Sequence, residues 1–70
     1  MKKTRYFVED FIERIFLWVY IPDEDNVTCR NINTKQLYSM INGDPLYKTF
    51  IDCIEQLKEI SKEEAFLLMI

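Results

Sequence analysis

The stretch Ile15–Ile21, IFLWVYI, is an unbroken run of seven apolar residues, and the polar sequence PDEDN at 22–26 ends it abruptly. A transmembrane helix needs about 20 apolar residues. This run is much shorter, and Glu13-Arg14 precedes it while three acidic residues follow it. We therefore expect no membrane span, and the run is either a piece of the core or a surface for another protein.

The apolar positions around this run favour a helix that starts well before it. Thr4 can cap the helix, and Ile21 should lie outside it, because a residue before proline is pushed out of the α region. The apolar spacing is i, i+3, i+4, i+7 and continues into the run, at Val8, Phe11, Ile12, Ile15 and Val19. A first helix is predicted from Thr4 to about Tyr20.

Start and stop signals predict the next two helices. Asn33 with Gln36 three residues later is a variant of the capping box, and Asn42-Gly43 is a typical helix end. Asp44 can then cap a third helix that has Pro45 at its first position, where the missing N–H costs nothing. Helical spacing continues through this segment at Leu46, Phe50, Cys53, Ile54, Leu57 and Ile60.

A regular capping box at Ser61–Glu64 opens a short last helix, Ala65 to Ile70. The predicted fold is therefore all-α, a single domain of residues 1–70 built as a compact bundle of three longer helices plus a short C-terminal helix. One alternative stays open. Residues 15–21 are rich in aromatic and β-branched side chains and could pair with 27–32 as a hairpin, which would give an α+β fold.

The sequence offers little equipment for catalysis or metal binding. It contains no histidine, so the usual general base near neutral pH is missing. Its two cysteines, Cys29 and Cys53, are too few for a structural zinc site and form no C-x-x-C pair. We expect a non-enzymatic protein without a cofactor or metal. No cleavable signal peptide is visible, so we expect reduced thiols and a cytoplasmic location.

Nucleic-acid binding is the alternative function. Residues 34–58, with the turn Asn42-Gly43-Asp44 inside, have the outline of a helix-turn-helix that would read DNA with Tyr47, Lys48 and Thr49. The net charge of −3 opposes this function, because it would repel phosphates. A transcriptional regulator of this kind is therefore the second hypothesis, and nucleic acid is not the favoured partner.

The first hypothesis is a small regulatory protein that binds another protein and forms a homodimer. Its apolar residues exceed what one small helical core requires, both in the run at 15–21 and at the C-terminus. Residues with AT-rich codons (Phe, Tyr, Met, Ile, Asn, Lys) number 31 of 70, against seven for Gly, Ala, Arg and Pro. This usage suits a phage or a low-GC bacterium, and hence an inhibitor of a host protein. The predicted interface residues are Phe16, Leu17, Trp18, Tyr20, Phe66 and Met69.

Overall fold

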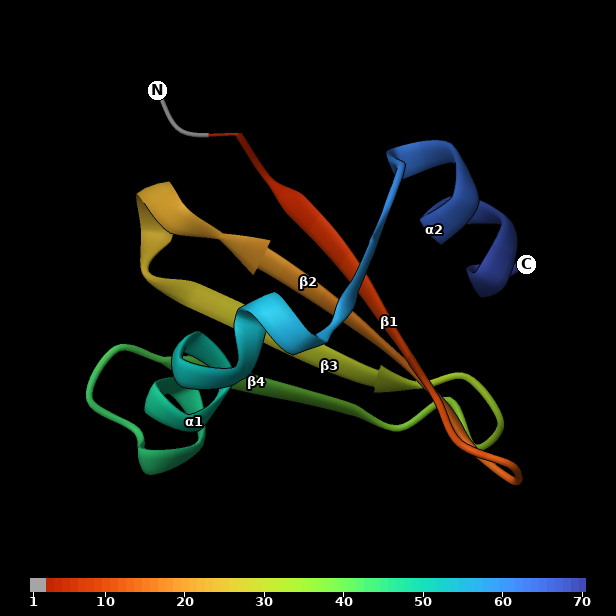
Figure 1. Ribbon diagram of the computed structural model, residues 1–70, viewed down its shortest axis with the longest axis horizontal. Coiled ribbons are helices and arrows are strands. Elements are labelled where there is room, and N and C mark those ends of the chain that lie inside the picture. Colours follow the sequence, from red (N-terminus) through yellow and green to blue (C-terminus); the bar gives the residue numbers. More distant parts are fainter. Residues whose placement is uncertain (1–2) are drawn as a thin grey trace.

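The computed structural model describes residues 3–70 and shows an α+β fold built on one antiparallel sheet (Figure 1). The sheet order is β4-β3-β2-β1-β5. Its strands are β1 (Arg5–Asp10), β2 (Ile15–Ile21), β3 (Asn26–Asn31), β4 (Leu37–Ile41) and β5 (Lys58–Ile60). The other elements are the helices α1 (Pro45–Cys53) and α2 (Lys62–Met69) and the 3-10 turns η1 (Pro22–Glu24) and η2 (Ile54–Gln56).

The predicted all-α bundle is wrong, and the first helix shows why. Residues 5–21 form the hairpin β1–β2, in which Val8 lies opposite Leu17. Backbone hydrogen bonds in both directions join Phe11 and Arg14 and close the turn. The helical spacing of Val8, Phe11, Ile12, Ile15 and Val19 was a coincidence, because in the structure these residues come from two strands and the turn between them.

The apolar run at 15–21 forms a strand that is covered on both faces by other parts of the chain. β2 is the middle strand, and its side chains alternate between the two sides of the sheet. Phe16, Trp18 and Tyr20 face the cluster that includes α1, while Leu17 and Val19 belong to the cluster beneath α2. A strand covered on both faces carries a continuous apolar sequence rather than an alternating one.

β2 and β3 form the hairpin of the alternative α+β prediction, with its second strand at 26–31. Their register places Trp18 opposite Cys29 and Tyr20 opposite Val27. The η1 turn joins them, with Asp25 in the left-handed region at φ 48° and its N–H donating to the Pro22 carbonyl at 3.1 Å. Asp tolerates this conformation better than most residues. The acidic stretch is therefore an exposed turn of the hairpin.

The second predicted helix, from Asn33 to Asn42-Gly43, is also wrong, because residues 37–41 form β4. The polar residues before them build a turn instead of a helix start. The Asn31 side chain accepts hydrogen bonds from the N–H groups of Asn33 and Thr34, at 3.0 and 3.2 Å. This local pairing competes with helix formation, as Asn side chains commonly do.

The third predicted helix begins correctly but is shorter than its apolar spacing indicated. Pro45 occupies the first turn of α1, but the predicted cap by the Asp44 side chain is absent, because its carboxylate accepts the Ile41 N–H instead. The helix ends at Cys53 and the chain continues through η2 into β5. The capping box predicted for the start of the last helix is confirmed. The Glu64 N–H donates to Ser61 Oγ at 3.1 Å, and the Ser61 N–H donates to the Glu64 carboxylate at 3.3 Å.

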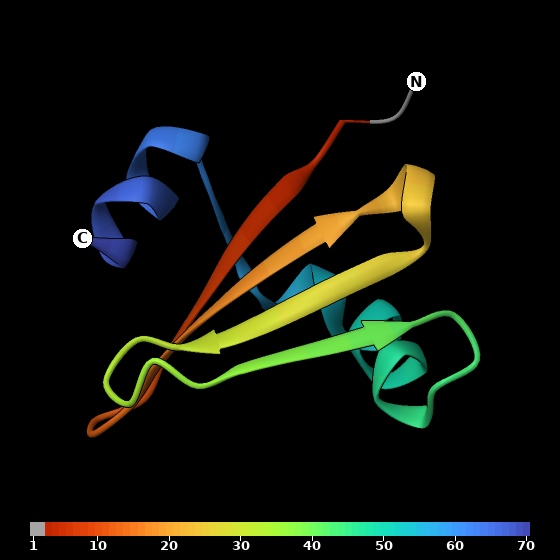
Figure 2. The ribbon, with the colours of Figure 1, turned by 180° about the vertical axis from the view of Figure 1, so that it is seen from behind.

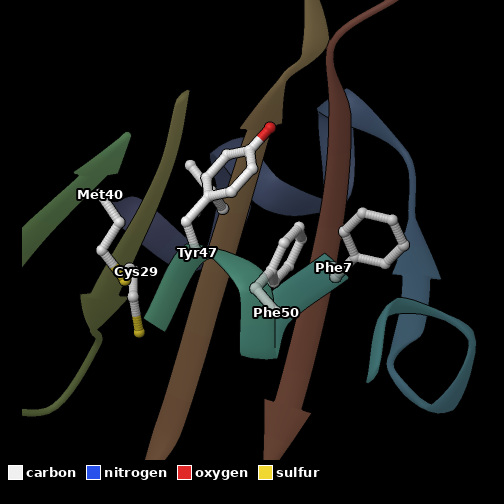
Figure 3. Packing of buried hydrophobic residues seen from close by; sticks show 6 residues of the cluster. Phe7, Cys29, Met40, Tyr47 and Phe50 are labelled. Atoms are coloured by element: carbon white, nitrogen blue, oxygen red, sulfur yellow. The ribbon is translucent and has the colours of Figure 1, made fainter. Parts of the chain in front are cut away.

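The larger of two clusters of buried residues lies between α1 and the sheet (Figure 3). Phe50 of α1 is at its centre, with ring centroids 5.9 Å from Phe7, 5.3 Å from Trp18 and 5.5 Å from Tyr20. The smaller cluster lies on the opposite face and joins α2 to β1, β2 and β5 through Leu17, Ile60 and Ala65. The two helices thus cover different faces of one sheet.

Candidate functional site

The outer surface of α2 is apolar although nothing in the described chain covers it. Ala65 is completely buried against the sheet, and Leu68 packs partly beside it. The remaining apolar residues of this segment face solvent: Phe66 is 60% exposed, Leu67 70%, Met69 44% and Ile70 88%. We call these four residues the α2 outer surface. Polar residues are confined to the start of the helix, at Lys62, Glu63 and Glu64.

The edge strand β4 forms a second exposed apolar region (Figure 2). It lies at the opposite edge of the sheet from β5, the strand that leads into α2. Leu37, Tyr38 and Ile41 are each more than half exposed. Tyr38 lies on the same side of the sheet as α1, because it is opposite Cys29 in the register, whereas Leu37 and Ile41 point to the other side. The strand therefore offers apolar side chains on both faces.

An apolar pocket of about 260 Å³ lies between α1 and the sheet. Trp18, Cys29, Phe50 and Cys53 contribute to its lining, and Glu9 is its one charged group, accepting a hydrogen bond from Trp18 Nε1 at 3.4 Å. Burial, with a smaller contribution from Glu9, raises the pKa of the Cys29 thiol to about 11. Because the thiol stays protonated near neutral pH, it lacks the thiolate that a nucleophile needs.

The charged groups of residues 3–70 form no cluster that could hold a metal ion. A salt bridge joins Arg5 and Glu59 at 2.8 Å across the β1–β5 pair, and both side chains are substantially exposed. The guanidinium of Arg5 lowers the pKa of Glu59, chiefly through this hydrogen bond. An exposed pair of this kind contributes little to stability. Within the same part of the chain, no three His, Cys, Asp or Glu residues are grouped so that they could hold a metal ion.

The six predicted interface residues lie at very different depths. Phe66 and Met69 belong to the α2 outer surface. Phe16, Trp18 and Tyr20 are half-buried and pack against the cluster around α1, and Leu17 is completely buried on the opposite face. Their role in an interface stays a prediction. The structure does show that one continuous patch on this chain cannot contain all six.

The sequence reasoning missed the β4 edge because it assigned residues 33–42 to a helix. A helix there would bury Leu37 and Ile41 in its apolar stripe, whereas both are exposed in β4. The available signal was the absence of any charge or proline from residues 37–41, in a chain in which 30% of residues are charged. Leu67 and Ile70 were missed for a simpler reason, since an apolar C-terminal segment does not reveal which of its residues face outward.

No family model, curated protein or solved structure matches this chain. None of the helices within residues 3–70 has the length and apolar character needed to cross a membrane.

Proposed function

We propose that this chain is a small non-enzymatic regulatory protein that acts by binding another protein through the α2 outer surface. The observation that carries the proposal is the exposure of Phe66, Leu67 and Ile70 on a helix whose sheet-facing side is already buried. A helix that is apolar on all sides belongs in a buried environment. Binding an apolar surface of a second protein would supply that environment.

The chemistry of the surface supports a protein partner over nucleic acid. Phe66 and Met69 belong to residue types that are enriched in the buried centres of protein interfaces. The charged residues at the start of the helix, Lys62, Glu63 and Glu64, carry a net charge of −1, so they provide no excess of positive charge to attract phosphates. The helix-turn-helix alternative also loses its first helix, because residues 37–41 are a strand.

The biological setting of the proposal rests on the sequence. Cys29 and Cys53 are both free thiols, which suits the cytoplasmic location that we propose. The bias toward residues with AT-rich codons suits a phage or low-GC bacterial source, and an inhibitor that occupies a host protein fits the small size of the chain. Homodimer formation is also part of the proposal.

The test is affinity capture by the tagged full chain from a lysate of a low-GC bacterium, followed by titration of the purified captured protein. We expect Phe66→Glu to weaken that complex at least about 30-fold, as loss of a central aromatic anchor does. Phe66 is mostly exposed, so the variant should stay folded. Glu63→Gln, in the first turn of the same helix, is the matched control and should bind like the wild type. Equal affinity of Phe66→Glu and the wild type would refute the proposed surface.

A further inference from the structure

The two edge strands of the sheet differ in how they are protected against pairing with another strand. β5 has only three residues, two of them are charged, and Glu59 is tied to Arg5 of the neighbouring strand. Short length and charged side chains are common protections of a sheet edge. β4 has five residues, Leu37-Tyr38-Ser39-Met40-Ile41, with no charge and no proline. The exposed edge of β4 is therefore open to another strand.

The hydrogen-bonding groups on the outer edge of β4 can be assigned from the pairing with β3. Backbone bonds from Asn31 N to Gln36 O and from Asn42 N to Asp25 O, both 2.9 Å, show that even-numbered residues of this segment bond to β3. In an antiparallel ladder the intervening residues point their N–H and C=O groups away. Leu37, Ser39 and Ile41 therefore direct theirs to the outer edge.

Asp44 closes one end of that edge. Its carboxylate accepts the Ile41 N–H at 3.0 Å, and its own N–H donates to the Ile41 carbonyl at 3.0 Å. Among the described residues, no partner is found for the outward groups of Leu37 and Ser39. The backbone groups of only two residues, Leu37 and Ser39, are thus open on this edge. This restricts the registers in which another strand can pair with it.

We propose that β4 pairs antiparallel with β4 of a second copy, with Tyr38 opposite Tyr38 of that copy. This inference specifies the homodimer of the proposed function and rests on it for the biological need to dimerise. In this register Leu37 of each copy lies opposite Ser39 of the other. All four open N–H groups then meet open carbonyls, and the Ile41 groups that Asp44 already occupies are not needed. The two five-stranded sheets become one continuous sheet.

The side chains and charges around β4 favour a second copy over an unrelated strand. The two-fold register brings the half-exposed Tyr38 rings together on one face, and aromatic cross-strand pairs stabilise antiparallel sheets. Because the pairing is antiparallel, it also brings the start of β4 in one copy, which Lys35 precedes, to the end of β4 in the other, where the Asp44 carboxylate lies on the outer edge. Symmetry repeats this approach of opposite charges at the other end of the pair. The α2 outer surfaces stay free in both copies.

The test is sedimentation equilibrium of the full chain from micromolar to millimolar concentration, comparing the wild type with Ser39→Pro and Ser39→Ala. Proline removes an N–H that points away from β3, so the fold should be retained, and circular dichroism checks this. Both variants lose the hydrogen bond from Asn26 Nδ2 to Ser39 Oγ, so this loss cannot explain a difference between them. Only Ser39→Pro also loses the backbone N–H at position 39. We expect a dimeric wild type, an unchanged Ser39→Ala and a dimerisation Kd raised at least about tenfold in Ser39→Pro.

Three results would overturn the pairing: a wild type that is monomeric at every concentration, a folded Ser39→Pro that dimerises like the wild type, or a dimer that only Phe66→Glu disrupts. If Ser39→Pro is misfolded, Leu37→Lys is the replacement, since a lysine on the exposed edge should weaken the dimer and leave the core intact. A Leu37→Lys variant that dimerises normally would also refute the pairing. A monomeric wild type, or a Ser39→Pro or Leu37→Lys variant that dimerises normally, would refute the pairing but leave the proposed partner binding through Phe66 intact. A dimer that only Phe66→Glu disrupts would count against both proposals.

Discussion

Phe50→Ala is expected to lower the free energy of unfolding by about 3–5 kcal/mol. Phe50 is 3% exposed and packs against Phe7, Trp18 and Tyr20, so truncation leaves a cavity where α1 meets the sheet. A domain of 70 residues has a total stability of roughly 4–10 kcal/mol. The substitution should therefore unfold a large fraction of the protein, which urea denaturation monitored by circular dichroism would measure.

Leu46→Ala is the matched control for Phe50→Ala, because Leu46 lies on the same helix and is 65% exposed. It should change stability by no more than about 0.5 kcal/mol. Equal effects of the two substitutions would mean that α1 does not face the sheet through Phe50.

The pair Leu17→Ala and Ile12→Ala distinguishes the sheet from the helical bundle. Leu17 is completely buried and Ile12 is fully exposed in the turn between β1 and β2. We expect Leu17→Ala to lower stability by about 2–5 kcal/mol and Ile12→Ala to have little effect. The bundle predicts the reverse, since its first helix buries Ile12 and leaves Leu17 outside the core. Thermal denaturation of both variants is sufficient for the comparison.

The short-range signals in the sequence predicted local structure well where one capping interaction decides it. The capping box at Ser61–Glu64 and the proline at the start of α1 are both present. Each of these depends on residues within one helical turn, so no knowledge of the rest of the chain is needed. The same local reasoning failed at Asn33, where a side chain two residues earlier, Asn31, takes over the backbone N–H groups.

The apolar spacing wrongly predicted a helix at β2, because hydrophobic periodicity cannot distinguish a strand covered on both faces from a buried helix. The decisive fact is that α1 and α2 cover opposite faces of the sheet, and this arrangement is set by residues 45–69, far along the chain. The candidate surfaces were only partly predictable for the same reason. Phe66 and Met69 were identified from a local apolar segment, whereas the open edge of β4 exists only once β3 has paired on its other side.

Both proposed surfaces depend on β2 as the middle strand. Its pairing with β3 sets the position of β4, and the face that carries Leu17 packs beneath α2. The most direct test is a nuclear Overhauser effect between the Hα protons of Trp18 and Cys29. These residues are opposite each other, and because Ile32 N donates to Ile15 O in the same ladder, theirs is a non-hydrogen-bonded pair. Such pairs have Cα atoms about 4.5 Å apart. We predict a strong Hα–Hα cross-peak between Trp18 and Cys29. Its absence, together with helical contacts from Ile15 Hα to the Trp18 N–H, would contradict the fold and both surfaces derived from it.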